Sequence, residues 1–118
     1  PEPQRTILEK TLIEKFRNSS LKIVLVRGSA HAGIIDAGCI DVMEMVTGNE
    51  LKKLIQSAET VICRSGYSTL MDLHLLGKKS IILIPTPGQT EQEYLAGYWE
   101  ATFGARCIQQ SAIKNSAL

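Results

Sequence analysis

The chain has 118 residues, which is enough for one domain and excludes a multidomain enzyme within this sequence. Its 13 Lys and Arg against 12 Asp and Glu give a formal net charge of +1, so neither a nucleic-acid partner nor binding to an acidic membrane through bulk charge is expected. Three cysteines without C-x-x-C spacing support no disulfide framework and no zinc site, and they indicate a reduced, cytoplasmic setting.

The apolar runs and the first residues of the chain indicate whether it spans a membrane and whether it is part of a longer protein. The apolar run Ile81–Ile84 is far shorter than the ~20 residues that a membrane-spanning helix needs. The chain opens on Pro-Glu-Pro without an initiator Met. We therefore expect a piece of a longer protein, with function shared with residues outside it.

The first predicted elements occupy residues 5–46. Apolar residues at helical spacing predict an amphipathic helix over 5–17, with Glu9 among the charged residues between them. A β-branched run at 23–26, closed by Gly28, predicts a strand that is buried on both faces. A loop over 28–38 and a second strand over 40–46 follow.

Helices and strands alternate in the rest of the chain. Asn49 is the predicted N-cap of a helix with its buried stripe at Leu51, Leu54, Ile55 and Ala58, and residues 60–63 form the next predicted strand. Ser65 and Gly66 open a helix that buries Leu70, Leu73 and Leu76 and ends at Gly77. A strand over 80–84, a loop over 85–90, a helix over 91–100 and a strand over 105–108 complete the prediction.

This alternation predicts an α/β fold: a Rossmann-like, open and mostly parallel sheet with helices on both faces. We expect residues 1–118 to form a single domain. In such sheets, ligands bind beyond the carboxyl ends of the strands. The segments 64–69 and 85–92 both fall at that edge.

The segment 63–69, Cys-Arg-Ser-Gly-Tyr-Ser-Thr, passes from a strand into a helix. Backbone N–H groups, hydroxyls and the helix dipole at such a point suit a phosphate, although Ser65 and Gly66 could also serve only as cap and turn. Asp72 lies four residues after Ser68 on the same helix face, where a carboxylate can accept the two hydroxyls of a ribose. The alternative for Asp72 is a solvated surface residue.

The segment 87–93, Pro-Gly-Gln-Thr-Glu-Gln-Glu, gathers amides and carboxylates at another helix start. Gln89 and Gln92 have the hydrogen-bonding groups to read sugar hydroxyls. Thr90 and Glu93 also have the spacing of a capping box, and the two interpretations are compatible.

Three other patterns in the sequence are weak predictors of a ligand or metal site. Gly-Lys-Lys-Ser at 77–80 echoes a P-loop, but position 72 holds Asp where that motif needs Gly. The glycines of the loop 28–33 have the wrong spacing for a dinucleotide fingerprint, although the loop could border a ligand. His31 and His74 lack neighbouring ligands at metal-binding spacing, so no metal site is expected.

Together, the stretches Ala58–Leu73 and Ile84–Ala96 resemble the C-terminal domain of family 28 glycosyltransferases, whose members include bacterial peptidoglycan N-acetylglucosaminyltransferases. The likeness is strongest from about residue 58 to residue 98. It implies the C-terminal half of a two-domain GT-B enzyme, which binds a nucleotide-sugar donor, in most members a UDP-sugar.

The resemblance also implies roles for individual residues. Asp72 stands where the family holds the ribose hydroxyls, Gln92 matches a Gln that contacts the donor sugar, and Glu93 replaces a second Gln of the peptidoglycan enzymes. That replacement leaves the donor sugar open, with UDP-N-acetylglucosamine expected. The full set of expected donor-binding residues is Arg64, Ser65, Gly66, Ser68, Thr69, Asp72, Gly88, Gln89, Glu91 and Gln92.

By the same resemblance, the first strand of the domain and an N-terminal acceptor domain are expected to precede residue 1. The acceptor, a sugar or lipid-linked sugar, and the general base would belong to that domain, and peripheral membrane association would be a property of the full-length protein. No metal or other cofactor is expected, and the piece alone should be inactive. The alternatives are a GT-B-like nucleotide-sugar hydrolase or epimerase, and a non-catalytic nucleotide-sugar-binding subunit.

Overall fold

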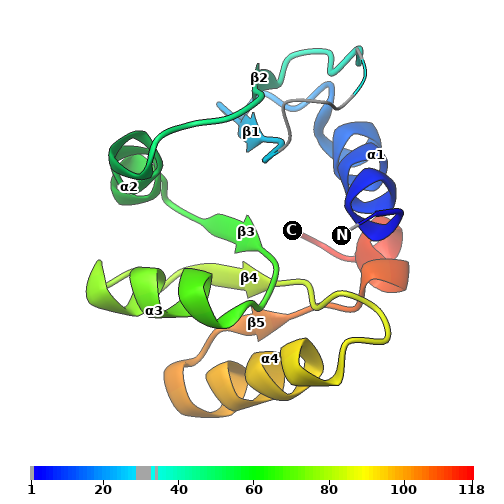
Figure 1. Ribbon diagram of the computed structural model, residues 1–118. Helices are drawn as coiled ribbons and strands as arrows, with labels where there is room; N and C mark the ends of the chain where they lie inside the picture. The colour runs from blue at the N-terminus through cyan, green and yellow to red at the C-terminus, as the bar shows by residue number, and fades with distance from the viewer. Residues whose placement is uncertain (1, 29–32, 34) are drawn as a thin grey trace. The chain divides into compact units, whose positions relative to one another are not determined.

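A computed structural model of the protein describes residues 2–28, 33 and 35–118. The chain divides into two compact units, residues 1–51 and 52–118, and each is described by itself (Figure 1). Across the described residues, no helix combines the length and the apolar character needed to cross a membrane.

The described residues of the first unit form a helix and a pair of strands, and the unit ends within a second helix. Helix α1 spans Gln4–Phe16, and the strands β1 (Val24–Val26) and β2 (Asp41–Met43) pair in parallel. Strand β2 is shorter than the predicted 40–46: its three residues pair with the three residues of β1, and the Gly28 N–H, just after β1, donates to Glu44 O at 2.9 Å. The small core of this unit consists of Ile13, Ala37 and Ile40, packed by Phe16, Ile23, Leu25, Ile35 and Val42.

A buried ion pair lies beside this core. Glu9 and Arg27 are only 5% and 6% exposed, and Arg27 donates to both carboxylate oxygens of Glu9, from Nε at 2.6 Å and from Nη2 at 3.0 Å. These hydrogen bonds lower the pKa of Glu9 and raise that of Arg27. Glu9 is therefore an inward-facing residue of α1, whereas Ile7, predicted for the apolar face, is 45% exposed.

Helix α2 spans Gly48–Ser57, and it begins at a different cap from the predicted one. The Glu50 N–H donates to Thr47 Oγ1 at 3.1 Å, and the Thr47 N–H donates to Glu50 Oε1 at 3.2 Å. This reciprocal pair is a capping box, which satisfies two N–H groups at once. The prediction of Asn49 as N-cap is wrong, because Asn49 already lies inside the helix.

The second unit holds a three-stranded parallel sheet in the order β3-β4-β5. Its strands are β3 (Val61–Cys63), β4 (Ile81–Leu83) and β5 (Arg106–Cys107). Helices α3 (Tyr67–Leu75) and α4 (Thr90–Phe103) connect the strands and flank the sheet, and a 3₁₀ helix, η1 (Gln110–Asn115), follows β5 (Figure 1). The predicted α/β class, Rossmann-like with parallel strands flanked by helices, is confirmed.

The core of this unit lies where the helices meet the sheet. Alternate residues of β4, Ile81 and Leu83, face the buried side chains of the helices, and the whole cluster comprises Ile55, Leu70, Leu73, Ile81, Leu83, Ala96, Trp99 and Ala105. Leu76 packs against it and is half-buried. Helix α3 ends as predicted at Gly77, whose φ is 69°, with the Lys78 N–H bonded to Leu73 O. This core fixes the start of each helix at the sheet edge.

Candidate functional site

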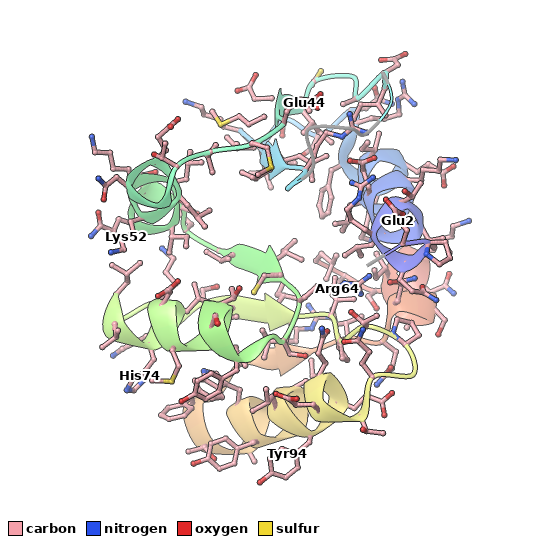
Figure 2. All side chains as sticks on the ribbon, in the orientation of Figure 1. Glu2, Glu44, Lys52, Arg64, His74 and Tyr94 are labelled. Carbon is pink, nitrogen blue, oxygen red and sulfur yellow. The ribbon has the colours of Figure 1, made fainter. Side chains whose placement is uncertain are left out.

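The two motif-bearing segments lie at one edge of the three-stranded sheet. Cys63 and Leu83 are register partners at the ends of β3 and β4, and the Ile84 N–H donates to Cys63 O at 2.9 Å. Figure 2 shows Arg64 at this edge, and its Nη1 donates to Ile84 O at 3.2 Å and to Pro85 O at 3.3 Å. The structure thus brings the segments after β3 and β4 together, as the topology predicts.

The N-terminus of α3 carries no side-chain cap. Its N-cap is Gly66, in extended conformation, and its first turn contains no acidic residue. Ser68 and Thr69 are exposed in that turn. Uncapped N–H groups and the positive end of the helix dipole are suited to an anion.

Asp72 follows one turn later on the same helix and is exposed. Residues four apart on a helix lie on the same face, so Asp72 and Ser68 share one side of α3. The carboxylate is accessible to a ligand that reaches along this side from the helix start.

A tight turn precedes α4. The Gln89 N–H donates to Thr86 O at 3.1 Å, and Gly88 has a φ of 82°. Pro87 and Gly88 thus occupy the central positions of a type II turn, where the second residue must adopt positive φ. Gly88 and Gln89 are exposed, so this turn presents them to solvent.

The side-chain amide of Gln92 holds the turn from inside. Its Oε1 accepts from the Thr86 N–H at 2.8 Å, and its Nε2 donates to Gln89 Oε1 at 3.0 Å. An amide group offers two N–H donors and two acceptor positions. Gln92 therefore keeps one N–H and one acceptor position for another partner while its place is fixed.

The predicted capping box at Thr90 and Glu93 does not form. The N-cap of α4 is Gln89, which makes no side-chain cap, and Thr90 is the first helical residue. The Glu93 N–H instead donates to the Gln89 carbonyl at 3.1 Å. The turn before α4 is held by Gln92, and the first turn of the helix presents Glu91 and Glu93.

Ser65 is completely buried, and its Oγ donates to Gln92 O at 2.7 Å. Ser65 does not cap α3, which leaves the helix start open. This bond joins the segment after β3 to the first turn of α4.

Thr86 is the residue of this edge that sequence reasoning missed. It is 2% exposed, and its Oγ1 has no hydrogen-bond partner among the residues that the structure describes. The Pro and Gly content of 85–90 predicted a loop and did not indicate burial of Thr86; the one signal for burial was the run of apolar residues that ends at Ile84.

Burial shifts the pKa of two titratable groups at this edge. Burial raises the pKa of the Cys63 thiol to about 12, so the thiol is neutral at ordinary pH. Burial also lowers the pKa of Arg64, which still leaves a guanidinium protonated. The edge is thus equipped for binding through N–H groups, hydroxyls and amides.

Of the two histidines, only His74 is among the described residues. It lies exposed on α3 (Figure 2), and its ring centroid is 5.2 Å from that of Phe103. The prediction for His31, with most of the loop 28–33, falls outside the described residues. Over the ranges 2–28 and 35–118, together with residue 33, no group of three or more His, Cys, Asp and Glu side chains is gathered for a metal.

Comparison with known proteins agrees with this geometry. Residues 8–118 match the Glycosyltransferase family 28 C-terminal domain. The chain is 32% identical over 84 residues to the UDP-N-acetylglucosamine--N-acetylmuramyl-(pentapeptide) pyrophosphoryl-undecaprenol N-acetylglucosamine transferase of Rhizobium etli, covering 65% of this chain and 22% of that relative. No solved structure matches the chain. The match over nearly the whole sequence shows that the chain belongs to the glycosyltransferase family 28 C-terminal domain family.

Proposed function

We propose that the chain is the donor-binding half of a glycosyltransferase, and that its donor is a UDP-sugar. The observation that carries the proposal is the meeting of two turns at one sheet edge: the uncapped N-terminus of α3 and the amide-bearing turn before α4. The first suits a diphosphate and the second suits sugar hydroxyls. The name of the Rhizobium etli relative, a UDP-N-acetylglucosamine-dependent transferase, supports UDP-N-acetylglucosamine as the donor.

In this proposal the N-terminus of α3 holds the diphosphate. A helix dipole contributes about 0.3 to 1 kcal/mol toward an anion at the surface, so the hydroxyls of Ser68 and Thr69 and the backbone N–H groups must act together. During transfer, the nucleoside diphosphate gains negative charge as it leaves. The same groups therefore favour its departure.

Asp72 is proposed to accept the ribose hydroxyls. It lies about one turn beyond the proposed diphosphate position on the exposed side of α3. A carboxylate can accept two neighbouring hydroxyls at once, and such charge-assisted bonds are stronger than neutral ones.

Gln92 is proposed to read the sugar of the donor. Its amide retains one N–H and one acceptor position after its bonds to Thr86 and Gln89. Because these bonds fix the amide beforehand, the sugar meets a preorganised donor and acceptor. Gly88, Gln89 and Glu91 border the same exposed turn.

The acceptor site and the general base are proposed to lie outside these residues. The chain spans about a fifth of the length of the relative it matches, whose name specifies a lipid-linked acceptor. We therefore propose a lipid-linked sugar acceptor, peripheral membrane association of the whole protein and a cytoplasmic location. Since positioning two reactants supplies much of the rate, this chain alone should transfer no sugar.

Calorimetric titration of the 118-residue chain tests the donor site. We expect UDP to bind more tightly than GDP, and Asp72→Ala to weaken UDP binding by about 1 to 3 kcal/mol, because the ribose hydroxyls lose a charged acceptor. Glu59→Ala is the matched control, since Glu59 is an exposed carboxylate at the opposite end of β3. Equal UDP affinity of wild type and Asp72→Ala would contradict the ribose assignment. Affinity should be the same in EDTA, because no metal is proposed.

Gln92→Ala tests the sugar assignment in the same titrations. We expect it to keep most of the UDP affinity and to reduce the difference between UDP and UDP-N-acetylglucosamine, because its amide is proposed to meet the sugar. Gln56→Ala, on the exposed side of α2, serves as control. An equal loss for both ligands would show that Gln92 supports the whole site and does not read the sugar.

A further inference from the structure

One buried hydroxyl connects the two proposed ligand-binding turns. Ser65 directly precedes Gly66, the N-cap of α3, and is completely buried. Its Oγ donates to the main-chain carbonyl of Gln92 at 2.7 Å. Its proton is therefore engaged by the protein, and its side chain is not presented to solvent at the helix start.

Gln92 is consequently held at two points by two different segments. Ser65, from the segment after β3, binds its main chain, and the N–H of Thr86, from the segment after β4, binds its side chain at 2.8 Å. Loss of the Thr86 bond would let the amide adopt further rotamers, and loss of the Ser65 bond would let the main chain that carries the amide move. Either freedom costs free energy to suppress when a ligand binds.

We propose that Ser65 is a positioning residue, which sets the distance between the diphosphate-binding start of α3 and the sugar-reading amide of Gln92. This inference rests on the proposed function, and it assigns Ser65 a role without direct contact to the donor. UDP occupies only the α3 side, whereas a UDP-sugar spans both turns. Ser65 therefore contributes to discrimination between UDP and UDP-sugar more than to UDP affinity.

A double-mutant cycle tests this role through the ratio of Kd for UDP to Kd for UDP-N-acetylglucosamine. We expect Ser65→Ala to lower the ratio by about three- to tenfold, as for the loss of one neutral hydrogen bond, and to change the UDP affinity by less than about twofold. In a Gln92→Ala background, where the amide is absent, Ser65→Ala should change the ratio by less than about twofold.

Ser57→Ala is the matched control, because it also removes a Ser hydroxyl that donates to a main-chain carbonyl, Leu54 O at 3.2 Å, but at the end of α2 that precedes β3. It should leave the ratio unchanged. A merely structural role for Ser65 would weaken both ligands equally and add to the effect of Gln92→Ala, and either result would overturn the proposal. If Ser65→Ala does not fold, Ser65→Cys retains a similar size and a weak donor, and it should show a smaller change in the same direction.

Amide hydrogen exchange without ligand separates this inference from the proposed function. We expect the Thr86 N–H, which is bonded to Gln92, to exchange at least about threefold faster in Ser65→Ala than in wild type. The Ile84 N–H, bonded to Cys63 O, is the internal reference and should be unchanged. An unchanged Thr86 rate overturns the positioning role even if nucleotides bind. If wild type binds no uridine nucleotide, the proposed function fails, and this exchange rate still decides whether Ser65 holds Gln92.

Discussion

The two units of the protein bury polar groups in opposite ways. Residues 1–51 bury a charged pair, Glu9 with Arg27, and both carboxylate oxygens of Glu9 accept hydrogen bonds from the guanidinium. Residues 52–118 bury two neutral hydroxyls at the candidate site, Ser65 with a partner and Thr86 without one among the described residues.

The charged pair and the neutral hydroxyls suit different tasks: the pair stabilises the fold, and the hydroxyls lie at the candidate ligand site. Loss of one member of a buried ion pair leaves an uncompensated charge and strongly destabilises the protein. The residues of such a pair are therefore poorly suited to exchanging their partner for a ligand. Neutral hydroxyls and amides cost less to rearrange, and each can serve a second partner. The neutral network lies at the sheet edge where ligands bind in such folds, and the charged pair packs beside the core of its own unit.

The largest expected effect is on stability and comes from breaking the charged pair. Glu9→Leu should lower the free energy of unfolding by about 3 to 5 kcal/mol, because it leaves the buried Arg27 guanidinium without its main partner. Urea denaturation measures this change. Glu14→Leu, at an exposed glutamate of the same helix, is the control.

A second variant sharpens this test. Glu9→Leu combined with Arg27→Met replaces the pair by apolar side chains of similar volume and should recover most of the lost stability. If the double variant is as unstable as Glu9→Leu, the loss does not come from an uncompensated charge.

The second-largest expected effect is a loss of stability in acid, where protonation of Glu9 weakens the charged pair. The hydrogen bonds from Arg27 lower the pKa of Glu9 in the folded state, so the carboxylate contributes stability above its unfolded pKa. That contribution is lost as pH falls from the ordinary Glu value of about 4.3 through the lower folded pKa. The free energy of unfolding, measured by urea denaturation between pH 7 and pH 3, should therefore fall more steeply with decreasing pH for wild type than for the double variant. Parallel curves would contradict the assignment.

The smallest expected effect lies in the neutral network. Thr86→Val removes a buried hydroxyl that has no hydrogen-bond partner within the described part of the chain, and it should raise the free energy of unfolding by about 1 kcal/mol, because an unsatisfied polar group no longer has to be desolvated. Thermal unfolding checks the sign. A loss of stability would show that Thr86 Oγ1 has a partner in solution, which would weaken the contrast between the two units.

The strand positions, the end of α3 and the shared sheet edge were predicted correctly because each follows from a local sequence pattern. The predicted strands at 23–26, 40–46, 60–63, 80–84 and 105–108 each contain one of the strands of the described chain, and the stop at Gly77 followed from the need for positive φ after α3. The alternation of strands and helices then placed both motif-bearing segments at one edge, since parallel strands all end on the same side.

The features that the sequence did not predict depend on contacts between distant residues. Glu9 and Arg27 are 18 positions apart, and Ser65 and Gln92 are 27 positions apart. A glutamate between apolar helix residues has the same local pattern whether it faces solvent or a buried guanidinium. The choice of Thr47 over Asn49 as N-cap was within reach, because Glu50 stands three residues after Thr47 as a capping box requires.

The turn at Pro87 and Gly88 has an evolutionary consequence. Its shape depends on the fixed φ of proline and the positive φ of glycine, and on the hydrogen bond between the Thr86 and Gln89 main chains. The Gln92 amide, bonded to Thr86 and to the Gln89 side chain, supports this shape, whereas no side-chain bond from Glu91 or Glu93 to the turn is seen among the described residues. Positions 91 and 93 can therefore change without rebuilding the backbone that presents them, so that, under the proposed function, point substitutions there would be a route to a new sugar preference.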